Sequence, residues 1–372
     1  MKFVKLFLIL LPIFSVKSFL IEQSISKLSI RKQSMSKQPI SKQPISKPSI
    51  SKRSINKLAI SKQSTNYNKY NIKMTSNNFY VCKKTKNFIK LIRPINIIPT
   101  LALSFYGGFM MNKSLYKLLK SSSFIVSVIN TILIMSSGMI INDIIDISID
   151  KTNNPDRPLV NGDVSLREAK IYVLLLLVLT EFLSFKFLPN ELQLIVNLAI
   201  VNIGIYTSFL KKIPLIKNLS CAFLVAFSSV FSGMASVENI FLHKNISLLL
   251  ITSYLVFIGS LCNEILLDIS DIIGDKLNKI NTIAVLYGED FSLNLVEYIL
   301  KINVMFVTIF VANLFNIQKG LPLLVILSPL VNNLNKIRKY NYSYNIIRKQ
   351  VKKTNKPLFM SLLYLILLSF SK

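Results

Sequence analysis

From about residue 85 to its end, the chain alternates long apolar runs with short polar segments. Roughly 20 apolar residues in a helix cross the hydrocarbon core of a bilayer, and several runs approach that length. The pattern therefore predicts an all-α fold, a multi-span membrane helix bundle. The nine expected helices cover roughly 94–111, 124–145, 169–188, 192–210, 219–238, 246–267, 296–317, 320–334 and 357–371.

Basic residues support this count because they gather in alternate loops. Lys151 and Arg157 follow the second run, and Lys211 and Lys212 follow the fourth, whereas fewer bases follow the odd-numbered runs. This asymmetry predicts that the basic loops and the N-terminus share one side of the membrane, stroma or cytosol. Topology thus accounts for a formal charge of +28 in a chain of mean hydropathy +0.49, and no nucleic-acid partner is expected.

The first 84 residues differ in composition and are expected to direct the chain to its compartment. Residues 1–18 resemble a signal peptide, with a basic start and an apolar core too short for a membrane anchor. Residues 19–84 are basic, Ser-rich and of low complexity, with Lys at every fifth position over much of their length. This two-part presequence resembles those of plastids acquired by secondary endosymbiosis; the alternative is a disordered basic tail attracted to anionic lipid. The transmembrane domain is expected at 85–372.

Acidic residues are few and concentrated. Eight of the 17 acids lie in two short segments, which end the second and the sixth apolar runs. At about 100° per residue, the spaced acids of each segment fall within roughly 60° on one helix face. Four crossings separate the segments, so both are expected to emerge on the same side of the membrane. The spaced acids are Asp143, Asp146, Asp150, Glu264, Asp268, Asp271 and Asp275.

Two acidic faces on one side of a membrane indicate bound cations, because clustered carboxylates repel one another. All-oxygen ligands suit Mg²⁺ or Mn²⁺ rather than zinc, and Mg²⁺ prefers one or two carboxylates together with substrate phosphate oxygens. A diphosphate bridging two or more Mg²⁺ ions fits this pattern; the alternative is a pair of solvated acidic loops. The expected metal ligands are Asp143, Asp146, Asp150, Asp268, Asp271 and Asp275. The cations expected to clamp the phosphate are Arg93, Arg157, Lys211 and Lys212.

The two acidic segments resemble the motifs of the UbiA-type intramembrane prenyltransferase family. The matching text is NDIIDISIDKTNNPDRPLVNGDVS at 142–165 and EILLDISDIIGDKLNKINTIAVLYG at 264–288, with a weaker match in YTSFLKK at 206–212. The resemblance covers about residues 85–372. It implies a nine-helix bundle around a lateral cavity, with Mg²⁺-bound diphosphate between the two motifs.

The resemblance also implies roles for individual residues. It assigns metal and diphosphate binding to Asn142, Asp146, Asp150, Asp268, Asp271 and Asp275. It further implies that Arg157 and Lys211 contact the diphosphate, and that Tyr206 binds phosphate or stabilises the developing cation. The residues expected to be catalytic are Asp146, Asp150, Asp271 and Tyr206. One departure stands out: many relatives have Arg just before the Glu of the second motif, where this chain has Asn263.

The predicted activity is Mg²⁺-dependent transfer of a polyprenyl group from its diphosphate to a ring or lipid acceptor in a plastid membrane. A homogentisate-like acceptor is favoured, with chlorophyllide (chlorophyll synthase) and geranylgeranylglyceryl phosphate as alternatives. Membrane lipid is expected to surround the prenyl tail. A different class, a divalent-cation transporter, remains open because the two motifs recur four spans apart.

Overall fold

The computed structural model describes residues 84–208 and 213–371, which belong to one compact unit spanning Asn66–Lys372. In these ranges the chain forms helices and no strands. The predicted signal peptide and all of the transit-like segment except Lys84 fall outside the described ranges, so the domain boundaries at 1–18 and 19–84 stay predictions.

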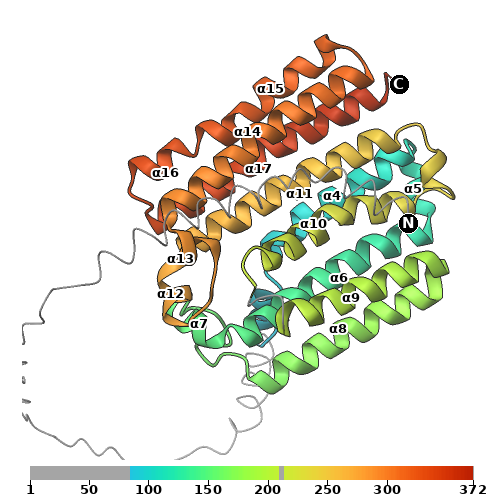
Figure 1. The fold of residues 1–372 in the computed structure, drawn as a ribbon. Coiled ribbons are helices and arrows are strands. Elements are labelled where there is room, and N and C mark those ends of the chain that lie inside the picture. The colour runs from blue at the N-terminus through green and yellow to red at the C-terminus, as the bar shows by residue number, and fades with distance from the viewer. Residues whose placement is uncertain (1–83, 209–212, 372) are drawn as a thin grey trace, which may run out of the picture. The chain divides into compact units, whose positions relative to one another are not determined.

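Nine long helices occur within the described ranges, and each overlaps one of the apolar runs (Figure 1). They are α4 (Ile97–Met111), α6 (Ser122–Ile145), α8 (Leu166–Phe187), α9 (Asn190–Ser208), α10 (Ile216–Met234), α11 (Ile246–Ser270), α14 (Glu289–Leu314), α15 (Ile317–Asn332) and α17 (Tyr344–Ser369). Shorter helices connect them: η1 (Pro94–Asn96), α5 (Leu115–Lys120), α7 (Ile147–Asn153), η3 (Ile240–Leu242), α12 (Ile272–Leu277), α13 (Ile283–Tyr287) and α16 (Asn335–Lys339). The all-α prediction is confirmed.

Five of the helices, among the described residues, are long and apolar enough to cross a membrane. These are α4 with its preceding η1 turn, α6, α10, α11 and α14. Of the other long helices, α15 has only 16 residues, and α17 begins with a basic segment. A bundle that spans a membrane is thus supported, whereas the count of nine crossings stays a prediction.

Helix α11 has the most buried membrane-length segment, because helices pack against it on several sides. It contacts α10 on one side and α14 and α17 on the other (Figure 1). Next to α10, α4 approaches closely at Gly107, where an added Cβ would lie 1.8 Å from the backbone oxygen of Ser229. Only glycine permits that separation, so this residue sets the distance between α4 and α10.

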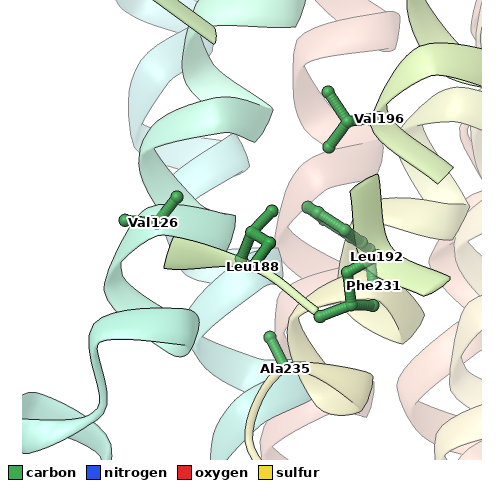
Figure 2. Packing of buried hydrophobic residues seen from close by; sticks show 6 residues of the cluster. All are labelled: Val126, Leu188, Leu192, Val196, Phe231 and Ala235. Atoms are coloured by element: carbon green, nitrogen blue, oxygen red, sulfur yellow. The ribbon is translucent and has the colours of Figure 1, made fainter. Parts of the chain in front are cut away.

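Helices α6, α8 and α9 pack together at the other edge of the bundle. Figure 2 shows their apolar contact with α10. The cluster consists of Val126, Leu188, Leu192, Val196, Phe231 and Ala235. Burying such side chains contributes about 1.5–3 kcal/mol for each large one in water, and in lipid the same packing supplies dispersion contacts. The cluster holds α6 in place at the end opposite to its acidic residues.

The two acidic segments share a bend that the sequence did not predict. Helix α6 ends at Ile145 and α7 begins at Ile147, so Asp146 lies at the junction; Asp271 lies at the same junction between α11 and α12. Their backbone angles are nearly equal, φ −88° and ψ 8° for Asp146, φ −101° and ψ 9° for Asp271. Each acidic segment is therefore two helices joined at an aspartate, although the hydrogen bonds to residues four positions earlier continue through both junctions.

The short helices after the bends lie against each other, which brings the two acidic segments together. An added Cβ at Gly274 of α12 would lie 2.1 Å from Oδ1 of Asn153 in α7. Helices α7 and α12 also lie side by side in Figure 1. The segments that end the second and sixth apolar runs thus meet at one end of the bundle, as the sequence predicted.

Candidate functional site

The first acidic segment buries its carboxylates against arginine side chains. Asp143, in the last turn of α6, is only 2% exposed and accepts hydrogen bonds from Arg93 and Arg157. The distance from Arg157 Nη1 to Asp143 Oδ1 is 2.9 Å. The same Nη1 pairs with Asp150 in α7, whose other oxygen accepts a 3.2 Å hydrogen bond from Asn154. One guanidinium therefore links the acids on both sides of the bend at Asp146.

Arg93 reaches Asp143 from an unusual backbone conformation. Its φ of 49° and ψ of 72° are left-handed, and Pro94 follows it at the start of η1. This conformation costs a non-glycine residue about 1–2 kcal/mol. An ion pair with a buried carboxylate offsets the cost, because Arg93 adds a second cation to the one that Arg157 supplies to Asp143. Strain of this kind is often found at functional sites.

The second acidic segment is neutralised by residues from other helices. Lys217, at the start of α10, places Nζ 2.6 Å from Oδ1 of Asp268, and Asn218 Nδ2 donates to the other carboxylate oxygen at 2.8 Å. Arg348, from α17, places Nη2 3.0 Å and 3.3 Å from the two oxygens of Asp271. The acids of α11 therefore depend on cations that lie 51 and 77 positions away in sequence.

Asp275 is the acid that lacks a full set of partners. It is 6% exposed, and its Oδ2 is buried with no hydrogen-bond partner among the described residues. Burial raises its pKa to about 7, and the negative charges of Asp268, Asp271 and Asp146 act in the same direction. The influence of Asp146 places the two acidic segments within electrostatic reach of each other. Burial also raises the pKa of Asp150, against the opposing effect of Arg157.

The carboxylate oxygens at this site fit a Mg²⁺ ion whose remaining coordination positions are filled by phosphate oxygens of a substrate. Among the described residues, no three His, Cys, Asp or Glu side chains converge as a ready-made metal cage. Mg²⁺ is usually held by one or two carboxylates, with water and phosphate oxygens filling the other positions. The unpartnered Oδ2 of Asp275 and the buried carboxylates around it supply such oxygen ligands.

Four other residues were predicted to belong to the site: Asn142, Tyr206, Lys211 and Lys212. Asn142 lies in the last turns of α6 and is half-buried. Tyr206 lies in α9, but its side chain is outside the described part of the structure, and Lys211 and Lys212 are outside the described residues altogether. Their predicted roles therefore stay proposals.

Sequence reasoning missed the parts that Lys217, Asn218 and Arg348 play beside the second segment. The first two follow the YTSFLKK segment closely, and that proximity was an available signal. Arg348 had no local signal, because it is one of many bases in a polar stretch between apolar runs. Its contact with Asp271 depends on how α17 packs against α11.

Comparison with known proteins gives a family and a fold. The sequence model of the UbiA prenyltransferase family matches residues 99–363. The chain is similar to the digeranylgeranylglyceryl phosphate synthase of Saccharolobus solfataricus, with 31% identity over 217 residues, 58% of this chain and 73% of that protein. It is also similar to the enzyme of that name from Sulfolobus acidocaldarius, with 30% identity over 219 residues, 58% of this chain and 75% of that protein.

Solved structures with the same helical arrangement agree. A digeranylgeranylglyceryl phosphate synthase structure has a TM-score of 0.58 at 23% identity, covering 78% of this chain and 99% of that one. A UbiA homologue from Archaeoglobus fulgidus, bound to DMAPP and Mg²⁺, has a TM-score of 0.54 at 18% identity, covering 75% of this chain and 97% of that one. At these identities the likeness establishes the fold.

Proposed function

Because the chain belongs to the UbiA prenyltransferase family, we propose that its two acidic segments bind a prenyl diphosphate with Mg²⁺ and that the prenyl group passes to a lipid acceptor of the glyceryl phosphate type. Family membership makes the chain a prenyl-transferring enzyme, and it removes the ground for a cation transporter. The donor, the metal and the acceptor are the parts that need support from the site.

The observation that carries the donor proposal is the paired bend. Asp146 and Asp271 occupy equivalent junctions, with Asp143 and Asp268 before them. Each set contains a buried carboxylate that is paired with a cation, Asp143 with Arg157 and Asp268 with Lys217, so acidic and basic groups lie side by side in both segments. A metal–diphosphate complex has the same alternation of charge, so it can replace protein–protein ion pairs by protein–ligand ones. The Archaeoglobus homologue bound to DMAPP and Mg²⁺ supports this choice of ligand.

The reaction breaks the bond between C1 of the prenyl group and the diphosphate oxygen, whose electron pair leaves with the diphosphate. Mg²⁺, when bound, neutralises charge on that leaving group. In this proposal Arg93 and Arg157, whose guanidinium groups pair with Asp143, also donate hydrogen bonds to the same charge as it develops, which lowers the barrier more than it lowers the energy of the bound donor. The acceptor oxygen then bonds to C1 and loses its proton to the released diphosphate. Tyr206, Lys211 and Lys212 are proposed to complete the phosphate-binding side from the end of α9.

The lipid acceptor is favoured by the relatives that carry the name digeranylgeranylglyceryl phosphate synthase. By analogy, the acceptor here is geranylgeranylglyceryl phosphate or a lipid alcohol of that shape. The homogentisate-like acceptor predicted from the sequence depended on plastid targeting by residues 1–84. All of those residues except Lys84 precede the described part of the structure, so plastid location and a ring acceptor stay predictions.

The test uses the full chain in detergent with labelled geranylgeranyl diphosphate, Mg²⁺ and four separate acceptors: geranylgeranylglyceryl phosphate, homogentisate, chlorophyllide and 4-hydroxybenzoate. We expect label transfer to the glyceryl phosphate, with none in Asp271→Asn and full transfer in the matched control Glu191→Gln. Glu191 is an exposed acid at the start of α9. Transfer only to homogentisate would replace the lipid acceptor by the ring acceptor. If Asp271→Asn were as active as the wild-type protein, the proposed site would be wrong.

A further inference from the structure

The last long helix, α17, brings a cation to the second acidic segment. Arg348 lies in the polar first turns of α17 and contacts both carboxylate oxygens of Asp271 through Nη2, at 3.0 Å and 3.3 Å. Its guanidinium carbon also lies 4.6 Å from the centre of the Tyr344 ring, one turn earlier in the same helix. The stacking restricts the side chain, so the charge is held at the bend between α11 and α12.

A second contact between the same two helices fixes this placement. Thr354 of α17 donates a 3.0 Å hydrogen bond to Oδ1 of Asn263 in α11. The later residue of α17, Thr354, contacts the earlier position, Asn263 in α11, and the earlier residue, Arg348, contacts the later position, Asp271 at the end of α11. The two helices therefore run antiparallel and are joined by two polar contacts. The position of Arg348 next to Asp271 is therefore fixed by the packing of two helices and not by a loop.

Arg348 has hydrogen-bonding capacity that Asp271 does not use. A guanidinium has five N–H donors in a planar fork, and Nη2 makes both contacts to the carboxylate. Its Nε is buried and has no hydrogen-bond partner among the described residues. A buried donor without a partner costs about 1–3 kcal/mol, which a ligand oxygen can recover. The side chain as a whole is 33% exposed, so a ligand can reach it.

We propose that Arg348 is a substrate-binding residue that pairs with Asp271 in the ligand-free protein and donates to the diphosphate of the prenyl donor when that donor binds. The inference rests on the proposed function. A diphosphate offers planar pairs of anionic oxygens that match the guanidinium fork better than a single carboxylate does. Arg348 would then do for the second acidic segment what Arg157 does for the first. This chain has the uncharged Asn263 at the position where many relatives carry an Arg, so that position supplies no cation.

The alternative is that Arg348 only balances the charge of Asp271. The two alternatives predict different effects of removing Arg348 on the affinity for diphosphate. A charge-balancing residue competes with Mg²⁺ for the carboxylate, so its removal would strengthen Mg²⁺ binding without diphosphate and leave diphosphate affinity unchanged. A diphosphate-binding residue, once removed, weakens binding of the diphosphate itself.

The experiment measures direct binding, not turnover. The full-length protein in detergent is titrated with inorganic diphosphate at fixed Mg²⁺, and then with an unreactive geranylgeranyl thiolodiphosphate, by calorimetry. Arg348→Gln is expected to bind both ligands about 10- to 100-fold more weakly, the usual effect of losing one hydrogen bond to a charged group. Arg348→Lys should recover part of the loss, since it keeps the charge but not the fork. Lys349→Gln removes the same charge from an exposed neighbour on α17 and should bind within about twofold of the wild-type protein.

Each result has a definite meaning. If Arg348→Gln binds diphosphate as tightly as the wild-type protein, the inference is wrong and the proposed function stands. If Lys349→Gln weakens binding as much as Arg348→Gln does, the effect is general charge and the inference is again wrong. If Arg348→Gln does not fold, Arg348→Lys decides alone: unchanged affinity contradicts the need for the fork. Failure of the wild-type protein to bind Mg²⁺ with diphosphate would remove the proposed function and this inference together.

Discussion

Replacing Gly274 by Ala should test whether contact between α7 and α12 aligns the two acidic segments. A Cβ at this position would lie 2.1 Å from Oδ1 of Asn153, whereas real Cβ contacts are essentially never shorter than 3.0 Å. All three heavy atoms of the Asn153 amide would lie within 2.4 Å of this Cβ, so either the Asn153 side chain must turn to another rotamer or the two helices must separate by about 0.9 Å. Asp150 and Asp275 lie on these helices, so separation of the helices moves a carboxylate of each acidic segment.

The expected effect on activity is much larger than the effect on stability. Overpacking costs about 1–3 kcal/mol, but Ala favours a helix over Gly by about 1 kcal/mol, so the net loss of stability is about 0–2 kcal/mol. A misplacement of about 1 Å in a catalytic site, by contrast, costs about 100-fold in rate. Gly274→Ala should thus keep most of its folded protein. Where the helices separate, it should lose about 100-fold in kcat/KM for the prenyl diphosphate; rotation of the Asn153 side chain alone would leave turnover nearly unchanged.

A double-variant cycle separates this mechanism from a general defect. Asn153→Ala removes the amide that the new Cβ would meet, so Gly274→Ala with Asn153→Ala should regain the turnover of Asn153→Ala alone. Gly204→Ala is the matched glycine control, because its added Cβ would meet no atom within 4 Å. Turnover of Gly274→Ala within about threefold of the wild-type protein, or equal loss in the double variant, would refute the reasoning.

Three other changes have clear expected results. Asp146→Ala should abolish turnover and Mg²⁺-dependent binding of diphosphate, while membrane insertion measured by fractionation stays normal, since a single residue at the end of α6 adds little to its hydrophobicity; near-normal turnover would contradict its role. Gly107→Ala places a Cβ 1.8 Å from the backbone oxygen of Ser229, which no rotamer change can relieve, so the melting temperature in detergent should fall by several degrees. Chelation of divalent ions should stop label transfer and added Mg²⁺ should restore it; transfer that continues after chelation would exclude the proposed metal role.

The sequence predicted the long helices well because hydrophobic runs dominate their burial. The errors lie where polar residues extend a helix beyond its apolar run. Helix α14 begins at Glu289 rather than near 296, and α17 begins at Tyr344 rather than near 357. In both cases the extra turns carry charged or polar side chains, which a search for apolar runs does not count as helix. The extension of α17 is the segment that contains Arg348.

The acidic residues of the candidate site could be predicted from the sequence, but the bends between them and the cations that contact them could not. Regular spacing showed that the aspartates belong together, and the count of apolar runs placed both acidic segments at one end of the bundle. The bends at Asp146 and Asp271 could not be read from spacing, because the backbone N–H of each still bonds four residues back, to Asn142 and Leu267. Spacing is the same in a straight helix and in one that bends between its hydrogen bonds.

The ion pairs explain how so many buried acids coexist in the ligand-free fold. Several carboxylates near one point would repel one another, and burying each without a partner would cost several kcal/mol. Arg157 and Lys217 remove that cost by pairing with Asp143 and Asp268, and each cation comes from outside the helix it neutralises. In the proposed function, a cation held in this way stabilises the fold before the donor binds and then donates to the donor's phosphates. The same pairs would therefore serve both stability and recognition, because the cations are held in place before the ligand arrives.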